Sequence, residues 1–206
     1  MARKILKMPR KAKKVLIVNN GTQYMEELRG KVSEHAGKAA DVEAVNVKDI
    51  KSKDVSGYDA IVLSGSSERK YDDPNLKYVL DNAEGTVVGI CHGHQAIVNH
   101  YGGTVEDLGT YQRGYKSIKT KSGEEAQVFK NHRYAATRAG SLEVLAESNV
   151  KDSKGKNRKI VEAVKHASKP HYGIQGHPEK GGHAQEMLYA ILNQVYQRKQ
   201  AYRKAA

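Results

Sequence analysis

The only cysteine of the chain, Cys91, stands in the segment GICHGHQ at residues 89–95. A lone cysteine is more often a small buried hydrophobic residue than a nucleophile. Here an apolar run ends at Cys91 and a helical pattern follows it, and a helix N-terminus favours the reactive thiolate. Gly89 and Gly93 would relieve the crowding of a sharp strand–turn–helix elbow. The pattern predicts a nucleophilic thiolate at the carboxyl edge of a sheet.

A second motif, GHPE at residues 176–179, carries a histidine and a carboxylate two positions apart. His177 can act as a general base, and Glu179 can fix the tautomer of its imidazole. A histidine beside a proline is usually structural when it stands alone. Because both motifs follow predicted strands, the combination indicates a triad of Cys91, His177 and Glu179.

Apolar runs and helical periodicities predict the elements that must position these groups. Strands alternate with helices, which favours an open, mostly parallel α/β sheet with helices on both faces. The predicted buried strands are 15–18, 42–45, 60–63, 86–90 and 171–175. The predicted helices are 23–35, 74–83, 94–100 and 183–202.

The second half of the chain is less regular and predicts a small antiparallel insertion. A polar, basic stretch at 149–159 is typical of a loop. The short strands predicted for the insertion are 116–121, 125–129, 142–146 and 160–164.

The net charge of +12 is concentrated at the two ends of the 206-residue chain. Residues 1–14 hold seven Lys/Arg and residues 198–206 hold four, and neither segment contains an acidic residue. We therefore expect one domain at 15–197 between a basic N-terminal arm (1–14) and a basic C-terminal tail (198–206). One cysteine cannot form an internal disulfide or a thiolate metal cluster. The sequence contains no run of about 18 apolar residues, which is the length that a membrane-spanning helix needs. A cytoplasmic protein without a metal is the expectation.

The two motifs resemble the signature segments of class I (triad) glutamine amidotransferases, which have a flavodoxin-like α/β fold. The chain is most similar to the separate glutaminase subunit of archaeal-type GMP synthases. NNGTQY at 19–24 resembles the opening turn of that subunit, and YGIQ at 172–175 resembles its approach to the histidine. The resemblance covers roughly residues 15–195.

The resemblance implies roles for nine residues. Cys91 would form a γ-glutamyl thioester with glutamine, assisted by His177 and Glu179. The oxyanion hole would come from His92 and the Gly65–Ser66 turn. Ammonia would pass to an ATP-dependent synthetase partner of the GMP synthase type, with no cofactor bound by this chain. The residues expected to bind glutamine are Gln95, His132 and Tyr134.

Several positions depart from the family pattern. The turn S-G-G-P appears as SGSS at 64–67, and S-H-x-D appears as NHRY at 131–134, so that a phenol replaces a carboxylate. Gly176 stands where the family has a phenylalanine, which removes packing beside the histidine. Asn19 stands where the family has an aspartate.

These departures leave a second interpretation open, in which a former amidotransferase binds RNA or the ribosome. Lys and Arg contacts to phosphates dominate such binding and need no recognition motif. The basic residues expected to serve it are Arg3, Lys4, Lys7, Arg10, Lys11, Lys13, Lys14, Arg198, Lys199, Arg203 and Lys204.

Overall fold

Five parallel strands form one half of a nine-stranded sheet in the computed structural model, which describes residues 12–37, 40–67 and 72–202. These strands lie in the order β2-β1-β3-β4-β9, and all four pairings among them are parallel. Their bounds are Lys13–Asn19 (β1), Ala40–Asn46 (β2), Ala60–Leu63 (β3), Thr86–Ile90 (β4) and His171–Ile174 (β9).

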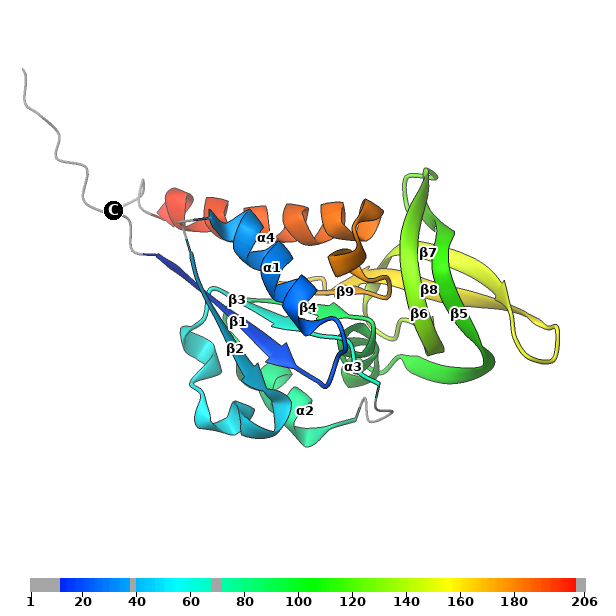
Figure 1. Ribbon diagram of the computed structural model, residues 1–206, viewed down its shortest axis with the longest axis horizontal. Coiled ribbons are helices and arrows are strands. Elements are labelled where there is room, and N and C mark those ends of the chain that lie inside the picture. Colours follow the sequence, from blue (N-terminus) through cyan, green and yellow to red (C-terminus); the bar gives the residue numbers. More distant parts are fainter. Residues whose placement is uncertain (1–11, 38–39, 68–71, 203–206) are drawn as a thin grey trace, which may run out of the picture.

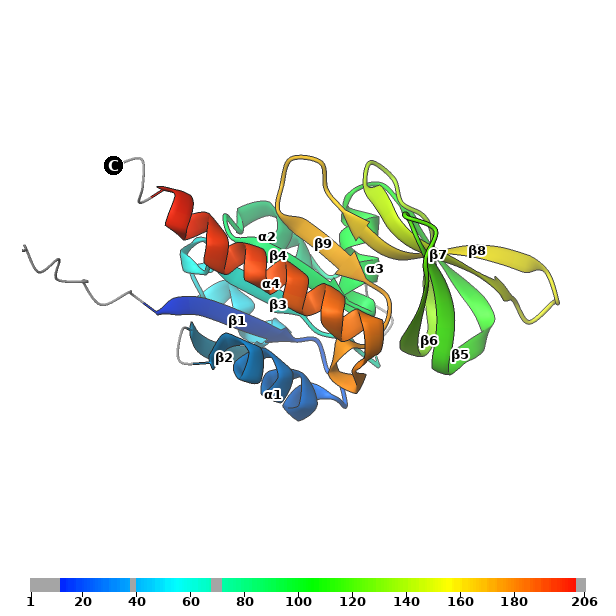
Figure 2. The same ribbon diagram turned by 90° about the horizontal axis from the view of Figure 1, so that it is seen from above.

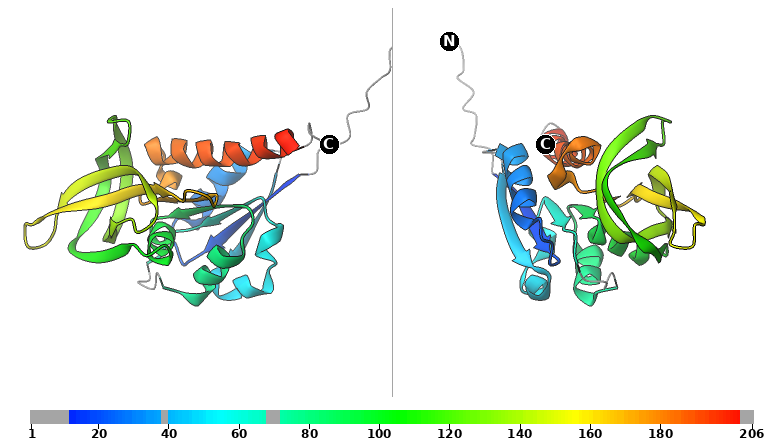
Figure 3. Two further views of the ribbon diagram at one scale, coloured as in Figure 1. Left: turned by 180° about the vertical axis from the view of Figure 1, so that it is seen from behind. Right: turned by 45° about the vertical axis from the view of Figure 1, so that its right-hand side comes forward.

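The other half of the sheet is antiparallel and continues in the order β9-β8-β7-β5-β6. Figures 1 and 3 show these strands as a curved unit at one end of the molecule, beside the parallel half. Their bounds are Thr104–Thr120 (β5), Glu125–Arg138 (β6), Glu143–Lys151 (β7) and Asn157–Lys165 (β8).

Helices cover both faces of the parallel half (Figure 2). Successive side chains of β1 point to opposite faces. Val15 and Ile17 pack in a core with α1 and α4, whereas Leu16 and Val18 pack in a core with α2 and α3. The helices are Met25–Ala36 (α1), Pro74–Asn82 (α2), His92–His100 (α3) and Gly182–Tyr202 (α4). Short 3₁₀ turns occupy Val47–Ser52 (η2), Val55–Gly57 (η3) and Pro178–Lys180 (η4).

Local sequence explains where α2 and α3 begin. The Asp73 carboxylate accepts a hydrogen bond from the Asn75 backbone N–H at 2.7 Å, and Pro74 occupies the first turn of α2. A single residue, Cys91, separates the end of β4 from the beginning of α3. No helix within the described ranges has the length and apolar character needed to cross a bilayer.

The predicted α/β fold is confirmed, and the bounds of β3 and β4 match the prediction. The antiparallel part is larger than predicted, because β5 and β6 run for 17 and 14 residues. The prediction of a continuous loop at 149–159 is wrong, because the two ends of this stretch belong to β7 and β8. β1 begins at Lys13, inside the segment expected to be an arm.

One ion pair is buried within the antiparallel half. Lys130 on β6 and Glu162 on β8 pair with each other, and each side chain is 1% exposed. The Lys130 ammonium also donates to the Ser148 hydroxyl of β7 at 3.1 Å. Because buried charges require partners, this contact fixes how three strands of the antiparallel half approach one another.

Candidate active site

Three neighbouring parallel strands deliver the candidate site residues to one edge of the sheet. Leu63 of β3 pairs with Gly89 of β4, and Ile90 of β4 pairs with Ile174 of β9. The segments that follow these strands therefore begin side by side. They carry the Gly65 turn, Cys91 and His177 respectively.

Cys91 lies at a strained elbow between β4 and α3. Its φ of 50° and ψ of −100° make it the one non-glycine residue with positive φ in the described part of the chain. The flanking glycines leave no room for side chains. A Cβ at Gly89 would lie 2.3 Å from the Gly93 carbonyl oxygen, and one at Gly93 would lie 2.5 Å from the Leu63 carbonyl oxygen. Backbone strain from an unfavourable φ is found most often at functional sites, where the surrounding packing maintains it.

His177 is held by Glu179 and faces Cys91. Its Nδ1 lies 2.8 Å from Glu179 Oε1, and both side chains are almost completely buried. Its backbone N–H donates to the Phe129 carbonyl of β6 at 2.9 Å. Burial lowers the pKa of His177, but attraction to Cys91 and Glu179 outweighs burial and raises that pKa to about 10. The arrangement therefore favours the protonated imidazolium form of His177 beside Cys91.

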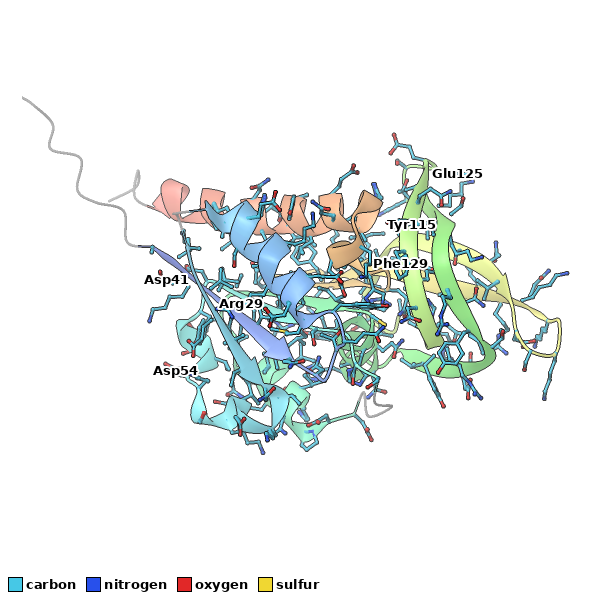
Figure 4. The ribbon with its side chains drawn as sticks, in the orientation of Figure 1. Arg29, Asp41, Asp54, Tyr115, Glu125 and Phe129 are labelled. Carbon is cyan, nitrogen blue, oxygen red and sulfur yellow. The ribbon has the colours of Figure 1, made fainter. Side chains whose placement is uncertain are left out.

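Aromatic rings pack against His177 even though Gly176 precedes it. The ring of Tyr24 lies edge-on at a centroid distance of 5.2 Å, and the ring of Phe129 lies edge-on at 6.3 Å. The stick view shows Phe129 projecting from β6 towards the parallel half (Figure 4). A Cβ at Gly176 would lie 2.9 Å from the Val128 Cβ, so this position has no space for a phenylalanine. The expected loss of packing beside the histidine is therefore wrong.

The Gly65 turn is clamped to the loop after β1. The Asn20 backbone N–H donates to Ser64 Oγ at 2.9 Å, and the Asn20 side-chain amide donates to the Ser64 carbonyl at 2.7 Å. A Cβ at Gly65 would lie 3.4 Å from His177 Cε1 and 3.6 Å from the Cys91 Cβ. The turn thus approaches both Cys91 and His177 to van der Waals distance.

A pocket of about 240 Å³ opens above Cys91. It brings together seven of the nine predicted site residues, and Gly65 and Glu179 lie directly behind it. The predicted residues that line the pocket are Ser66, Cys91, His92, Gln95, His132, Tyr134 and His177.

The three residues expected to bind glutamine, Gln95, His132 and Tyr134, all line this pocket. The amide nitrogen of Gln95 donates to the Tyr134 carbonyl at 2.7 Å and lies 3.2 Å from Gln175 Oε1. Gln95 therefore holds the backbone of β6 in place. Burial and the nearby Lys130 charge lower the pKa of His132 to about 3, so that its imidazole is neutral.

The pocket also contains residues that sequence reasoning did not select. Arg113, Asn131 and Arg133 line it from β5 and β6, and Thr22 lines it from the loop after β1. The antiparallel register of β5 and β6, which the sequence does not reveal, brings the first three together. Sequence reasoning also did not select Phe129, which packs against His177. Its one distinguishing feature in the sequence is that it is the only phenylalanine of the chain.

The basic residues of the RNA interpretation are distributed differently. Lys13 and Lys14 belong to β1, and the Lys14 backbone N–H donates to the Asp59 carboxylate at 3.0 Å. Arg198 and Lys199 fall within α4. RNA or ribosome binding stays an untested prediction. The remaining candidates lie outside the described residues: Arg3, Lys4, Lys7, Arg10, Lys11, Arg203 and Lys204.

Comparison with known proteins identifies the relatives of this chain. It is 30% identical over 185 residues to a glutamine-hydrolysing GMP synthase subunit of Methanococcus aeolicus, and the match covers 80% of this chain and 87% of that protein. It is also 32% identical over 177 residues to the GMP synthase of Francisella philomiragia, covering 81% of this chain but only 32% of that longer protein.

The fold has a relative of known structure. A protein of Thermoplasma acidophilum assigned as a GMP synthase subunit superposes with a TM-score of 0.77 at 21% identity, covering 94% of this chain and 98% of the other. The family model for class I glutamine amidotransferases matches residues 16–195. That match spans both motifs and nearly the whole described chain, and this protein belongs to the class I glutamine amidotransferase family.

Proposed function

We propose that this chain is a glutaminase, which hydrolyses the side-chain amide of glutamine through Cys91, His177 and Glu179. The observation that carries the proposal is the bond between His177 and Glu179 behind a cysteine held at a strained elbow. A nucleophile, a base and an orienting carboxylate in this order are the parts that acyl transfer needs.

The reaction proceeds in two steps. The Cys91 thiolate attacks the amide carbon of glutamine, and the tetrahedral intermediate places a negative charge on the former carbonyl oxygen. The His177 imidazolium gives its proton to the leaving nitrogen, so that ammonia departs and a γ-glutamyl thioester remains. Water then attacks the thioester, His177 accepts a proton from it, and glutamate and the thiolate are released.

The oxyanion hole in this proposal consists of the His92 backbone N–H and an amide of the Gly65–Ser66 turn. His92 is the first residue of α3, directly after Cys91, and the positive end of a helix dipole favours a negative charge at this position. Loss of one such donor typically slows an enzyme by about 10²–10³-fold. The Asn20–Ser64 clamp supports this role, because it fixes the turn before substrate arrives.

The partner in this proposal is an ATP-dependent synthetase that consumes the ammonia. The support comes from the names of the relatives, which are a glutamine-hydrolysing GMP synthase subunit and a GMP synthase of a single longer chain. GMP synthase is therefore the proposed type of partner. Glutamine, Gln95, His132 and Tyr134 stay as the proposed substrate and its binding residues.

Ammonia release from L-glutamine tests the proposal. The full chain is assayed alone and with the GMP synthase-type synthetase of the same organism, and Cys91→Ala is the variant. We expect ammonia release that the synthetase increases and that Cys91→Ala abolishes. Equal release by Cys91→Ala, or no release even with the synthetase and its nucleotide substrates, would overturn the proposal.

A further inference from the structure

Two arginines line the candidate pocket from neighbouring strands, and their partners differ. Arg133 of β6 is engaged by a carboxylate, since its Nε and Nη2 donate to Asp107 at 2.6 and 2.8 Å. Arg113 of β5 pairs with no acidic side chain of the described residues. Among the residues that the structure describes, the pocket therefore contains one guanidinium whose charge no neighbouring carboxylate balances.

Neutral neighbours hold Arg113 in place. Its Nε donates to Asn131 Oδ1 at 3.3 Å, from the residue directly opposite on β6. Its Cζ lies 5.6 Å from the centre of the Tyr111 ring, within the range of a cation–π contact. The bond to Asn131 uses Nε–H, which leaves the N–H groups of the two terminal nitrogens for a ligand.

A line of contacts connects Arg113 to the proposed base. The amide nitrogen of Asn131 donates to the Tyr24 hydroxyl at 3.0 Å, and the Tyr24 ring lies edge-on against His177. All four residues line the same pocket as Cys91. An anion on Arg113 would thus be bound at a position fixed relative to the reacting sulfur.

We propose that Arg113 binds the α-carboxylate of the amide substrate and selects substrates in which that carboxylate is free. This inference rests on the proposed glutaminase function. A planar guanidinium matches a carboxylate through two parallel N–H···O bonds, one to each oxygen. An ammonium has no acceptor, and a carboxamide has one acceptor oxygen and no charge, so neither group can replace the carboxylate in this pair of bonds. Arg113 is therefore a specificity-determining residue of the proposed glutaminase.

The test compares L-glutamine with its α-amide, in which a neutral carboxamide replaces the α-carboxylate. Ammonia release is measured for the wild type, Arg113→Met and Lys116→Met in the presence of the synthetase. Lys116 is a matched control, because it is exposed on the same strand and does not line the pocket. We expect Arg113→Met to raise KM for glutamine about tenfold, with little change in kcat, and to lose the preference for glutamine over the α-amide. Lys116→Met should keep that preference.

Binding to a variant that cannot react separates this inference from the proposed function. Calorimetry measures the Kd of L-glutamine for Cys91→Ala and for Cys91→Ala/Arg113→Met. A tenfold weaker Kd in the double variant supports the inference even where no turnover is found. An unchanged Kd and an unchanged preference for glutamine over the α-amide would overturn the role of Arg113 and leave the glutaminase proposal standing. Absence of glutamine binding to Cys91→Ala would overturn both.

Discussion

The buried pair of Lys130 and Glu162 predicts a large loss of stability when one partner is removed. Each side chain is 1% exposed, so Lys130→Met leaves a carboxylate in the core without its counter-charge. Breaking such a pair costs about 3–5 kcal/mol, whereas an exposed pair contributes at most about 1 kcal/mol. Lys121 and Glu143 form the matched control, since their side chains are 65% and 35% exposed.

Urea unfolding followed by circular dichroism measures the difference. We expect Lys130→Met to lower the free energy of unfolding by about 3–5 kcal/mol and Lys121→Met to lower it by less than about 1 kcal/mol. For a domain of this size, the first change corresponds to a fall in Tm of roughly 6–20 °C. The double variant Lys130→Met/Glu162→Leu should recover much of the loss, because an apolar pair of similar volume leaves no buried charge. Equal destabilisation by Lys130→Met and Lys121→Met would refute the reasoning.

Three further outcomes follow from the geometry of the site. Gly89→Ala should prevent correct folding, seen as loss of soluble protein or of a cooperative unfolding transition, because its Cβ would lie 2.3 Å from a carbonyl oxygen; Gly30→Ala, with nothing within 4 Å, should fold normally. Cys91→Ala should lower the pKa of His177 from about 10 towards its usual range in an NMR titration, since attraction to Cys91 raises it. That raised pKa stabilises the wild-type fold fully below about pH 6.5, and the contribution is lost as pH rises through about 10. The pKa of His132, lowered by burial to about 3, predicts that stability falls as pH drops below about 6.5. Between neutral pH and pH 5.5, neutral His132 should lower the free energy of unfolding by about 1.4 kcal/mol. This contribution should be missing from the urea unfolding of His132→Gln.

The sequence predicted the parallel half well because its strands carry a strong signal. Residues 60–63 and 86–90 are buried throughout, so that each appears as an uninterrupted run of mostly apolar residues with a turn behind it. The motifs around Cys91 and His177 follow such strands. Their proximity then depends only on the neighbouring positions of β4 and β9.

The antiparallel half could not be predicted equally well for two physical reasons. Exposed and half-buried residues dominate β5, and Gly109 and Gly114 interrupt its alternation, so most of the strand resembles a loop. The contact between Arg113 and Asn131 depends on the register of two long strands, which no local pattern specifies. Sequence reasoning therefore identified the reacting groups and missed part of the pocket wall.

Labelling of the cysteine tests the central claim most directly. The full chain is treated with a chloroketone analogue of L-glutamine, and intact-mass and peptide mass spectrometry locate the adduct. We predict one adduct, on Cys91, that excess L-glutamine prevents and that forms far more slowly in His177→Asn, whereas Lys116→Met is labelled at the wild-type rate. No adduct on Cys91, or labelling that neither L-glutamine nor His177→Asn affects, would contradict the account.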